Sequence, residues 1–285
     1  NKVKPFAQSV VINSLKVNEA DLNVNHYETS TPDSYQLGKL FIWADSIEIS
    51  EQAIQNPDKI FFANQIEARL KNYYAKLPDS LNTLYLKEMR VNTAQKSILF
   101  DSLLFTPLYP KYEYSQKFGQ ETDRIEGSWQ SAIIKNVDFK RLAEGRGFDA
   151  SQLIVNFAKI NVFRDKSNEL PRPVDRFPKL PRQSLQALPF YLNIDTTILQ
   201  GGYVSYSEHA LDGDTIGSIS LGNLDASIRQ LTNDSVKIAQ GASLTINAGT
   251  RIMGAGRLNA FFDMPYNAKN GEFYFEGILD SMDLT

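Results

Sequence analysis

Apolar and polar residues alternate with a period of two along most of this chain. Tyr, Phe, Ile and Val are frequent where they alternate, which is typical of β-strands whose two faces meet different surroundings. The clearest runs are Phe190, Leu192 and Ile194; Leu153, Val155 and Phe157; Ile219 and Leu221; Leu244, Ile246 and Ala248; and Leu258, Ala260, Phe262 and Met264. We therefore predict a mostly-β protein. Many short antiparallel strands should form a long twisted or curved sheet, groove-like or sandwich-like, with few short helices.

Helical periodicity is scarce. The best candidates are short helices at residues 51–56 and 138–144, the second closed by Gly145. Residues 65–77 are ambiguous, because they alternate in polarity but consist of good helix formers. Alternation favours a strand there, and we predict one.

Several strands are interrupted by a polar kink of two or three residues. The pattern occurs at residues 15–24, 133–139, 153–163, 191–199 and 220–228. At Ala158–Lys159 the apolar residues change from odd to even positions, which predicts a bulge or an abrupt twist. The copies are irregularly spaced, so they form a loose repeat and no strict solenoid period.

Residues 164–189 differ from the rest in composition. They contain five prolines, and six basic residues against three acidic ones. Because proline lacks the N–H donor that a sheet needs, we predict a long exposed crossover or linker there. This divides the chain into an N-terminal β-rich region (1–163), the crossover (164–189) and a C-terminal β-rich region (190–285). The basic linker could meet phosphate head groups, but a solvated loop accounts for it.

Composition excludes several classes of function. The 285 residues carry a formal charge of −3 without a long run of either sign, which argues against nucleic-acid binding. The sequence has no cysteine and two histidines, which excludes disulfides, thiol catalysis and Cys-ligated metals. No apolar stretch approaches the roughly 18 residues of a membrane span.

Candidate catalytic and metal-binding residues each have a simpler explanation. Asp195 and Glu208 could form the acid–base pair of a glycosidase, but chance pairs are expected among 33 acidic residues. Residues 212–214 could belong to a calcium loop, yet Asp-Gly is also a common hairpin turn. His209 is expected at the surface. We therefore predict a non-enzymatic protein without a metal or another cofactor.

The strand–kink–strand arrangement resembles the bacterial AsmA-like family of envelope proteins. The resemblance rests on INSLKVNEADLNV (12–24), LLFTPLYPKYEYSQKFGQETDRI (103–125), SAIIKNVDFKRL (131–142), LIVNFAKINVFRDK (153–166), LPRQSLQALPFYLNIDTTILQGGYVSYSE (180–208) and ISLGNLDASIRQLTN (219–233). These strings cover most of the chain but share a degenerate pattern and no invariant motif. The chain starts at Asn1 and lacks the N-terminal membrane anchor of the family, so we expect a piece of a longer protein.

The resemblance implies an exported, membrane-anchored protein on the periplasmic side of the cell envelope. It also implies a part in lipid transport or outer-membrane homeostasis, in which phospholipid acyl chains slide along an apolar sheet face. The lipid-facing candidates are Leu153, Val155, Phe157, Phe190, Leu192 and Ile194. Membrane attachment would come from segments outside this chain.

Two alternatives remain open from the sequence. The same alternation fits an extracellular or periplasmic β-sandwich with a filled core that acts as a binding or adhesion module. A glycoside-acting enzyme would need two Asp or Glu side chains that face each other across a cleft.

Overall fold

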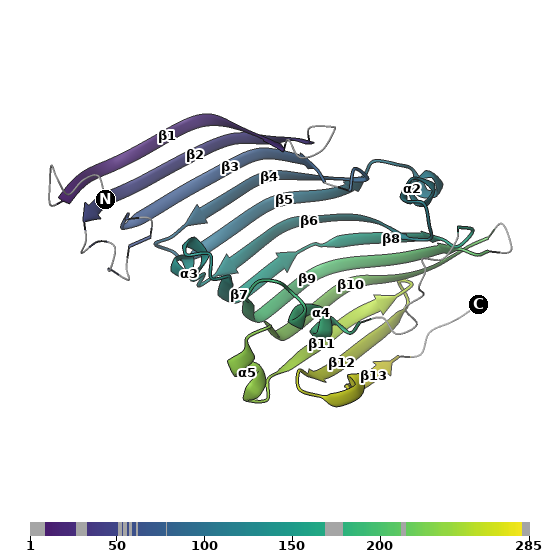
Figure 1. Ribbon diagram of the computed structural model, residues 1–285. Coiled ribbons are helices and arrows are strands. Elements are labelled where there is room, and N and C mark those ends of the chain that lie inside the picture. The colour runs from purple at the N-terminus through teal and green to yellow at the C-terminus, as the bar shows by residue number, and fades with distance from the viewer. Residues whose placement is uncertain are drawn as a thin grey trace.

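The chain folds into one large β-sheet with short helices at the ends of its strands (Figure 1). The computed structural model describes residues 9–26, 33–50, 53, 56, 59–60, 62–77, 79–168, 179–211 and 215–280, with side chains for all of these except 22–37 and 270. The strands are β1 (Ser9–His26), β2 (Asp33–Ser50), β3 (Gln65–Lys76), β4 (Asn82–Asn92), β5 (Ser97–Pro107), β6 (Asp123–Lys135), β7 (Phe148–Asn156), β8 (Lys159–Asp165), β9 (Leu192–His209), β10 (Ile216–Thr232), β11 (Ser243–Ile252), β12 (Gly256–Pro265) and β13 (Tyr274–Leu279). The helices are α2 (Lys111–Phe118), α3 (Phe139–Ala143), α4 (Pro181–Gln186), α5 (Ser235–Ala239) and the 3₁₀ turn η1 (Lys269–Gly271).

The mostly-β prediction is confirmed, with one difference in strand direction. Neighbouring strands pair antiparallel, except that β7 and β8 both run parallel to β9. Strands β7 and β8 lie end to end and share the same two neighbours, β6 and β9. A parallel pair requires a crossover that carries the chain back to the starting end of the sheet. Residues 166–191 make that connection, and α4 lies within it.

Strands from both predicted β-rich regions belong to the same sheet, because β9 pairs directly with β7 and β8. Residues 169–178 of the predicted crossover lie outside the described residues, as do residues 212–214 and most of the predicted helix at 51–56. The strand predicted at residues 65–77 is confirmed as β3. The helix predicted at 138–144 is confirmed as α3, with the Asp138 carboxylate capping it by accepting a hydrogen bond from the backbone N–H of Arg141.

A line of left-handed backbone conformations, here called the first crease, crosses the sheet near the middle of its strands. Its residues with positive φ are Glu19 in β1, Asn72 in β3, Ser102 in β5, Phe157 between β7 and β8, Gly201 in β9 and Asn223 in β10. Strand pairing aligns them. Ser131 of β6 pairs with both Asp101 and Asn156, so the residues that follow those two, Ser102 and Phe157, fall on one line.

A second crease lies nearer the strand ends that carry α3, α4 and α5. Positive φ marks it at Ser46 in β2, at Asn136 just after β6 and at Gln230 in β10. Asn136 donates a side-chain hydrogen bond to Ser151 of β7, at 2.8 Å. Ala150 and Gln152 of β7 pair with Ile194 and Thr196 of β9, which places Ser151 beside Asp195. The same two residues of β9 pair with Leu231 and Arg229 of β10, which places Gln230 on the other side of Asp195. The kinks predicted from the sequence therefore lie on two lines across the sheet.

Each crease reverses the alternation of side chains. A residue in the left-handed region turns the following chain over, so the apolar positions must change parity to stay on one face. In β5, Ile98 and Phe100 precede Ser102 of the first crease, whereas Leu103 and Phe105 follow it. The parity change predicted at Ala158–Lys159 is the break between β7 and β8 at Phe157, which has a φ of 51°. The short strands expected from the sequence thus join into longer, creased ones.

Seven of the 17 buried hydrophobic residues among those described form two small clusters, and the others lie outside both. The first consists of Ile98, Val137, Phe139 and Ala150, around α3. The second consists of Leu244, Met264 and Tyr266, with residues of α4 and α5 packed against it. Among the described residues, 25 large hydrophobic side chains are exposed but only 17 hydrophobic residues are buried. A single sheet layer explains this imbalance, because no second sheet covers its faces.

Candidate functional site

One face of the sheet is apolar between the two creases. Cross-strand pairs lie on the same face, and they form long rows: Ile134 pairs with Leu153, and Ala132 pairs with Val155, which pairs in turn with Leu199. We call the whole set the apolar strip. It comprises Leu15, Val17, Leu40, Ile42, Ala44, Ile66, Ala68, Leu70, Met89, Val91, Ile98, Phe100, Ala132, Ile134, Leu153, Val155, Leu199, Ala226, Ile228, Ile246, Ala248, Ala260 and Phe262.

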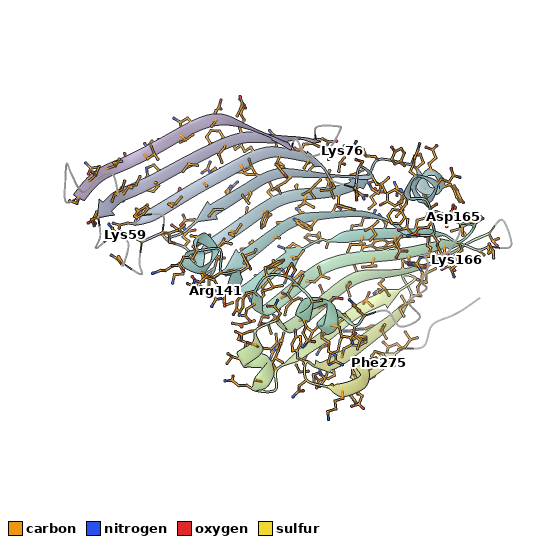
Figure 2. All side chains as sticks on the ribbon, in the orientation of Figure 1. Lys59, Lys76, Arg141, Asp165, Lys166 and Phe275 are labelled. Atoms are coloured by element: carbon orange, nitrogen blue, oxygen red, sulfur yellow. The ribbon has the colours of Figure 1, made fainter. Side chains whose placement is uncertain are left out.

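The opposite face between the creases, here called the polar face, carries mostly polar side chains, apart from one apolar row of Leu99, Ile133, Ile154 and Ile198. In β3 it presents Glu67, Arg69 and Lys71, and in β11 it presents Thr245 and Asn247. This face is suited to water, whereas the apolar strip is not. Figure 2 shows that side chains project from both sides of the sheet.

Among the described residues, the two clusters beside the helices pack against part of the apolar strip, here called its covered margin. At the α3 end, Met89, Val91 and Phe100 pack against the first cluster. At the α4 and α5 end, Ile246 and Phe262 pack against the second. Farther from these helices, Leu153, Val155 and Leu199 are half-buried and belong to neither cluster. The middle of the strip is therefore an open apolar surface.

A network of hydrogen bonds and one cation–π contact holds the helices at this margin. The Tyr191 hydroxyl donates to the Asp149 carboxylate at 2.9 Å and lies 3.0 Å from a carboxylate oxygen of Asp234, the N-cap of α5. The guanidinium of Arg141 in α3 lies over the Tyr191 ring, 4.1 Å from its centroid. Burial and the two carboxylates raise the pKa of Tyr191 well above its usual range. Arg182 of α4 is also buried and donates to the backbone carbonyls of residues 265, 268 and 272.

The six candidate residues fall into different environments. Leu153 and Val155 belong to the open part of the strip. Leu192 is the half-buried first residue of β9, and Ile194 is 6% exposed beyond the second crease, opposite Ala150. The other two candidates, Phe157 and Phe190, do not continue the strand rows as their sequence pattern predicted.

Phe157 and Phe190 are the two exposed aromatic candidates. Phe157 is 61% exposed on the first crease, and Phe190 is 52% exposed and precedes β9. A Cβ atom at Gly201 would come within 2.8 Å of the Phe157 ring, so the ring lies directly over this glycine. Gly201 also has a φ of 62°, which disfavours a side chain, but other residues adopt this conformation elsewhere on the crease, so the space is what requires glycine there. Phe157 does not extend the row of Leu153 and Val155, because strand β7 ends at Asn156 and Phe157 has a left-handed backbone conformation.

The two carboxylates considered as a catalytic pair are far apart. Asp195 and Glu208 lie on the same strand, thirteen residues apart, which corresponds to about 40 Å along an extended chain. Asp195 is bound by Lys237 at 2.7 Å, and Glu208 by Lys166 at 2.7 Å. This pair cannot act on one bond.

The sequence analysis missed a polar cluster at the other end of the strands, under α2. Asp165 is 3% exposed and accepts hydrogen bonds from the hydroxyl of Ser167 at 2.6 Å and from Asn168 at 3.0 Å. His209, expected at the surface, places Nδ1 3.3 Å from Asp165 and its ring against Tyr112 of α2. Burial raises the pKa of Asp165, but these hydrogen bonds and His209 outweigh it and hold the pKa below its usual value. Figure 2 places Asp165 at the end of the sheet opposite Arg141.

Two hollows of equal size lie on the polar face. The basic hollow, of about 600 Å³, is lined by Lys16, Asn18, Phe41, Trp43, Glu67, Arg69 and Lys71 of β1–β3, together with Val17 and Ile42. The neutral hollow, also about 600 Å³, is lined by residues of β9–β12 that include Asp225, Arg229, Asn247 and Phe261. The cross-strand pairs place the charged residues of both hollows on the side away from the apolar strip.

Two observations limit the chemistry of the described residues. No three His, Asp or Glu side chains among them come together as a group that could hold a metal ion. Within the same residues, no helix combines the length and the apolar character that crossing a membrane requires.

Comparison with protein-family models and with curated proteins finds no match to this chain. The apolar strip and the hollows therefore have to be interpreted from their own chemistry.

Proposed function

We propose that this chain binds and guides lipid acyl chains along the apolar strip, as a non-enzymatic segment of an AsmA-like envelope protein involved in lipid transport or outer-membrane homeostasis. The observation that carries the proposal is an apolar face that runs across eleven strands of a single-layer sheet, of which the helices in the described part of the chain cover only a portion. The periplasmic location and the membrane anchor outside this chain come with the family resemblance and are part of the same proposal.

The physical driving force is the removal of apolar surface from water. Each CH₂ group that leaves water contributes about 0.8 kcal/mol, so an acyl chain laid on Leu153, Val155 and Leu199 stabilises both partners. An ordinary exposed apolar patch on a monomer covers only a few hundred Å². The apolar strip, by contrast, is continuous from β1 to β12. A continuous apolar face of this kind indicates a binding surface.

The length of the strip favours guiding over a single fixed site. Eleven neighbouring strands at about 4.8 Å spacing extend for about 50 Å. One acyl chain fills about half of a bilayer's 30 Å hydrocarbon core, which corresponds to three or four strands. An acyl chain can therefore occupy more than one position along the strip. The side chains supply shape and desolvation and take no part in bond-making.

The first test is native mass spectrometry of the purified chain, with solvent extraction of whatever co-purifies. We expect phospholipid in near-stoichiometric amounts. A protein that remains free of lipid when phospholipid is supplied would contradict the proposal and favour a binding module with a protein or sugar partner.

A matched pair of variants assigns the bound lipid to one face. Val155→Glu places a charge in the apolar strip, whereas Ile154→Glu places the same charge at the adjacent, half-buried position on the opposite face. We expect Val155→Glu to lose at least tenfold in bound lipid and Ile154→Glu to retain it, with both sheets intact by circular dichroism. Equal retention by both variants would show that the strip is not the lipid site.

A further inference from the structure

We propose that the basic hollow on the polar face is a binding site for an anionic saccharide, that is, a sugar carrying phosphate, sulfate or carboxylate groups. This inference is independent of the proposed lipid function, because the hollow lies on the other face of the sheet. Its lining combines two aromatic rings, Phe41 and Trp43, with the three cations Lys16, Arg69 and Lys71.

The cations of the hollow are only partly neutralised by neighbouring carboxylates, since Glu88 of β4 stands opposite Lys71. Within the described part of the chain, neither Lys16 nor Arg69 has an ion-pair partner within 4.0 Å. Lys71 lies over the Phe41 ring, 5.3 Å from its centroid. The one carboxylate in the lining, Glu67, instead accepts hydrogen bonds from the side-chain amides of Gln65 and Asn92, at 3.1 and 3.0 Å. The hollow therefore keeps a net positive charge.

The strand register concentrates this charge in a way that lowers stability. Lys39 stands directly opposite Lys71, and Arg69 stands directly opposite Arg90. Like charges opposite each other across a strand pair are destabilising. Asp21 binds Lys39 at 3.3 Å and thus offsets part of the first pair. Glu88, which also stands opposite Lys71 and binds Arg90 at 2.7 Å, offsets part of both pairs, and an anionic ligand would offset the remaining charge.

The aromatic rings favour a sugar that carries anionic groups over a small inorganic anion. Trp43 stands between Lys16 of β1 and Glu67 of β3, and Phe41 stands opposite Arg69. Two rings on β2 that lie beside cations of β1 and β3 offer a flat apolar surface next to hydrogen-bond donors, which suits the apolar face of a sugar ring and its charged substituents. A nucleic acid would need a longer basic stripe than these three strands provide, and the chain as a whole carries a charge of −3.

The neutral hollow supplies an internal control. It has the same volume and lies on the same face, but it contains one acidic and one basic residue, Asp225 and Arg229. If the volume of a hollow alone decided what it binds, the two hollows would bind the same ligands. Charge and aromatic content predict that only the basic hollow binds the anionic sugar.

The test uses the fluorescence of Trp43. The chain has two tryptophans, Trp43 and Trp129, so the full-length Trp129→Phe variant reports on the basic hollow alone. We expect a heparin-derived hexasaccharide to change this fluorescence, with an affinity that falls as salt rises. Maltohexaose, a neutral sugar of the same length, should have no effect. Calorimetry on the unmodified chain measures the same binding without the substitution.

Three variants separate the possible explanations. Lys16→Gln combined with Arg69→Gln should weaken hexasaccharide binding at least tenfold, and Trp43→Leu should weaken it severalfold by calorimetry. Arg229→Gln in the neutral hollow should leave it unchanged. Val155→Glu should also leave it unchanged, which separates a saccharide site from the lipid strip and from a glycolipid bound through its acyl chains.

The proposal is overturned if the hexasaccharide fails to bind the unmodified chain, or binds the double variant equally well. It is also overturned if inorganic pyrophosphate binds as tightly with Trp43→Leu making no difference, since the site would then be a simple anion site. Tighter binding of a single-stranded oligonucleotide than of the hexasaccharide would assign the hollow to nucleic acid and reject the saccharide.

Discussion

The covered margin of the apolar face and its open middle are built from the same kinds of side chain, yet only one of them is packed. Ile134 of β6 packs against the first cluster, beneath α3. Its cross-strand partner Leu153 belongs to the same apolar row and is half-buried as Ile134 is, but it packs against neither cluster. The difference between them is contact with the cluster that includes Phe139 of α3, because the strands on both sides of the pair have the same pattern.

This comparison separates two uses of apolar residues. At the margin, α3, α4 and α5 exclude water and the apolar side chains stabilise the fold. In the open middle nothing in the described residues excludes water, so the side chains there contribute less to stability and leave surface for a ligand. Substitutions in the two regions should therefore differ in what they damage.

The largest expected effect is at the covered margin. Leu244 is 2% exposed in the second cluster, so Leu244→Ala should lower the free energy of unfolding by about 4 kcal/mol. Leu153→Ala removes the same atoms from the open strip and should cost about 1 kcal/mol. Urea denaturation of both variants measures the difference. Equal losses would mean that the strip is as well covered as the clusters.

An intermediate effect is expected at the first crease, which bounds the open strip. Gly201→Ala introduces a Cβ atom into the left-handed conformation and against the Phe157 ring, and should cost about 2 kcal/mol. Gly217→Ala is the matched control, because no atom lies within 4 Å of the added Cβ. We expect no loss of stability there. Thermal unfolding that shifts equally for both variants would contradict the requirement for glycine on the crease.

The smallest effect concerns pH and the cluster under α2. Because the folded-state pKa of Asp165 lies below its unfolded value of about 3.9, its contribution to stability is fully present above that pH. The contribution is lost as the pH falls through the folded pKa. The stability difference between the unmodified chain and Asp165→Asn should therefore be present at about pH 5 and shrink below about pH 4. Denaturation series at each pH check this, and a difference that grows on acidification would be opposite to the expected sign.

Much of the fold followed from local pattern. Alternation predicted the strands, and the ambiguous stretch at 65–77 was assigned correctly because polarity alternates there whatever the helix propensity. The kinks were visible as well, including the parity change at Ala158–Lys159. The parallel pairing of β9 with β7 and β8 was not, because strand direction depends on where a crossover returns and no local pattern records that.

The candidate site was only partly visible in the sequence. Leu153 and Val155 lie in the strip, but Phe157 and Phe190 do not extend the rows, since a single left-handed residue ended one strand and the other strand begins after Phe190. The basic hollow had no local signature. Lys16, Trp43 and Arg69 come from three strands, and their proximity depends on strand register. The partnership of Asp165 with His209 likewise joins residues 44 positions apart.

The sequence by itself determined the β class of this protein and the existence of one apolar and one polar side in each strand, because both depend on residue type at alternate positions. Only the tertiary structure decided that the strands form one layer, that the kinks align as two creases, and which apolar residues are covered. Those properties depend on register, and register is set by the sum of many cross-strand pairs and by the helices that fold back onto the sheet.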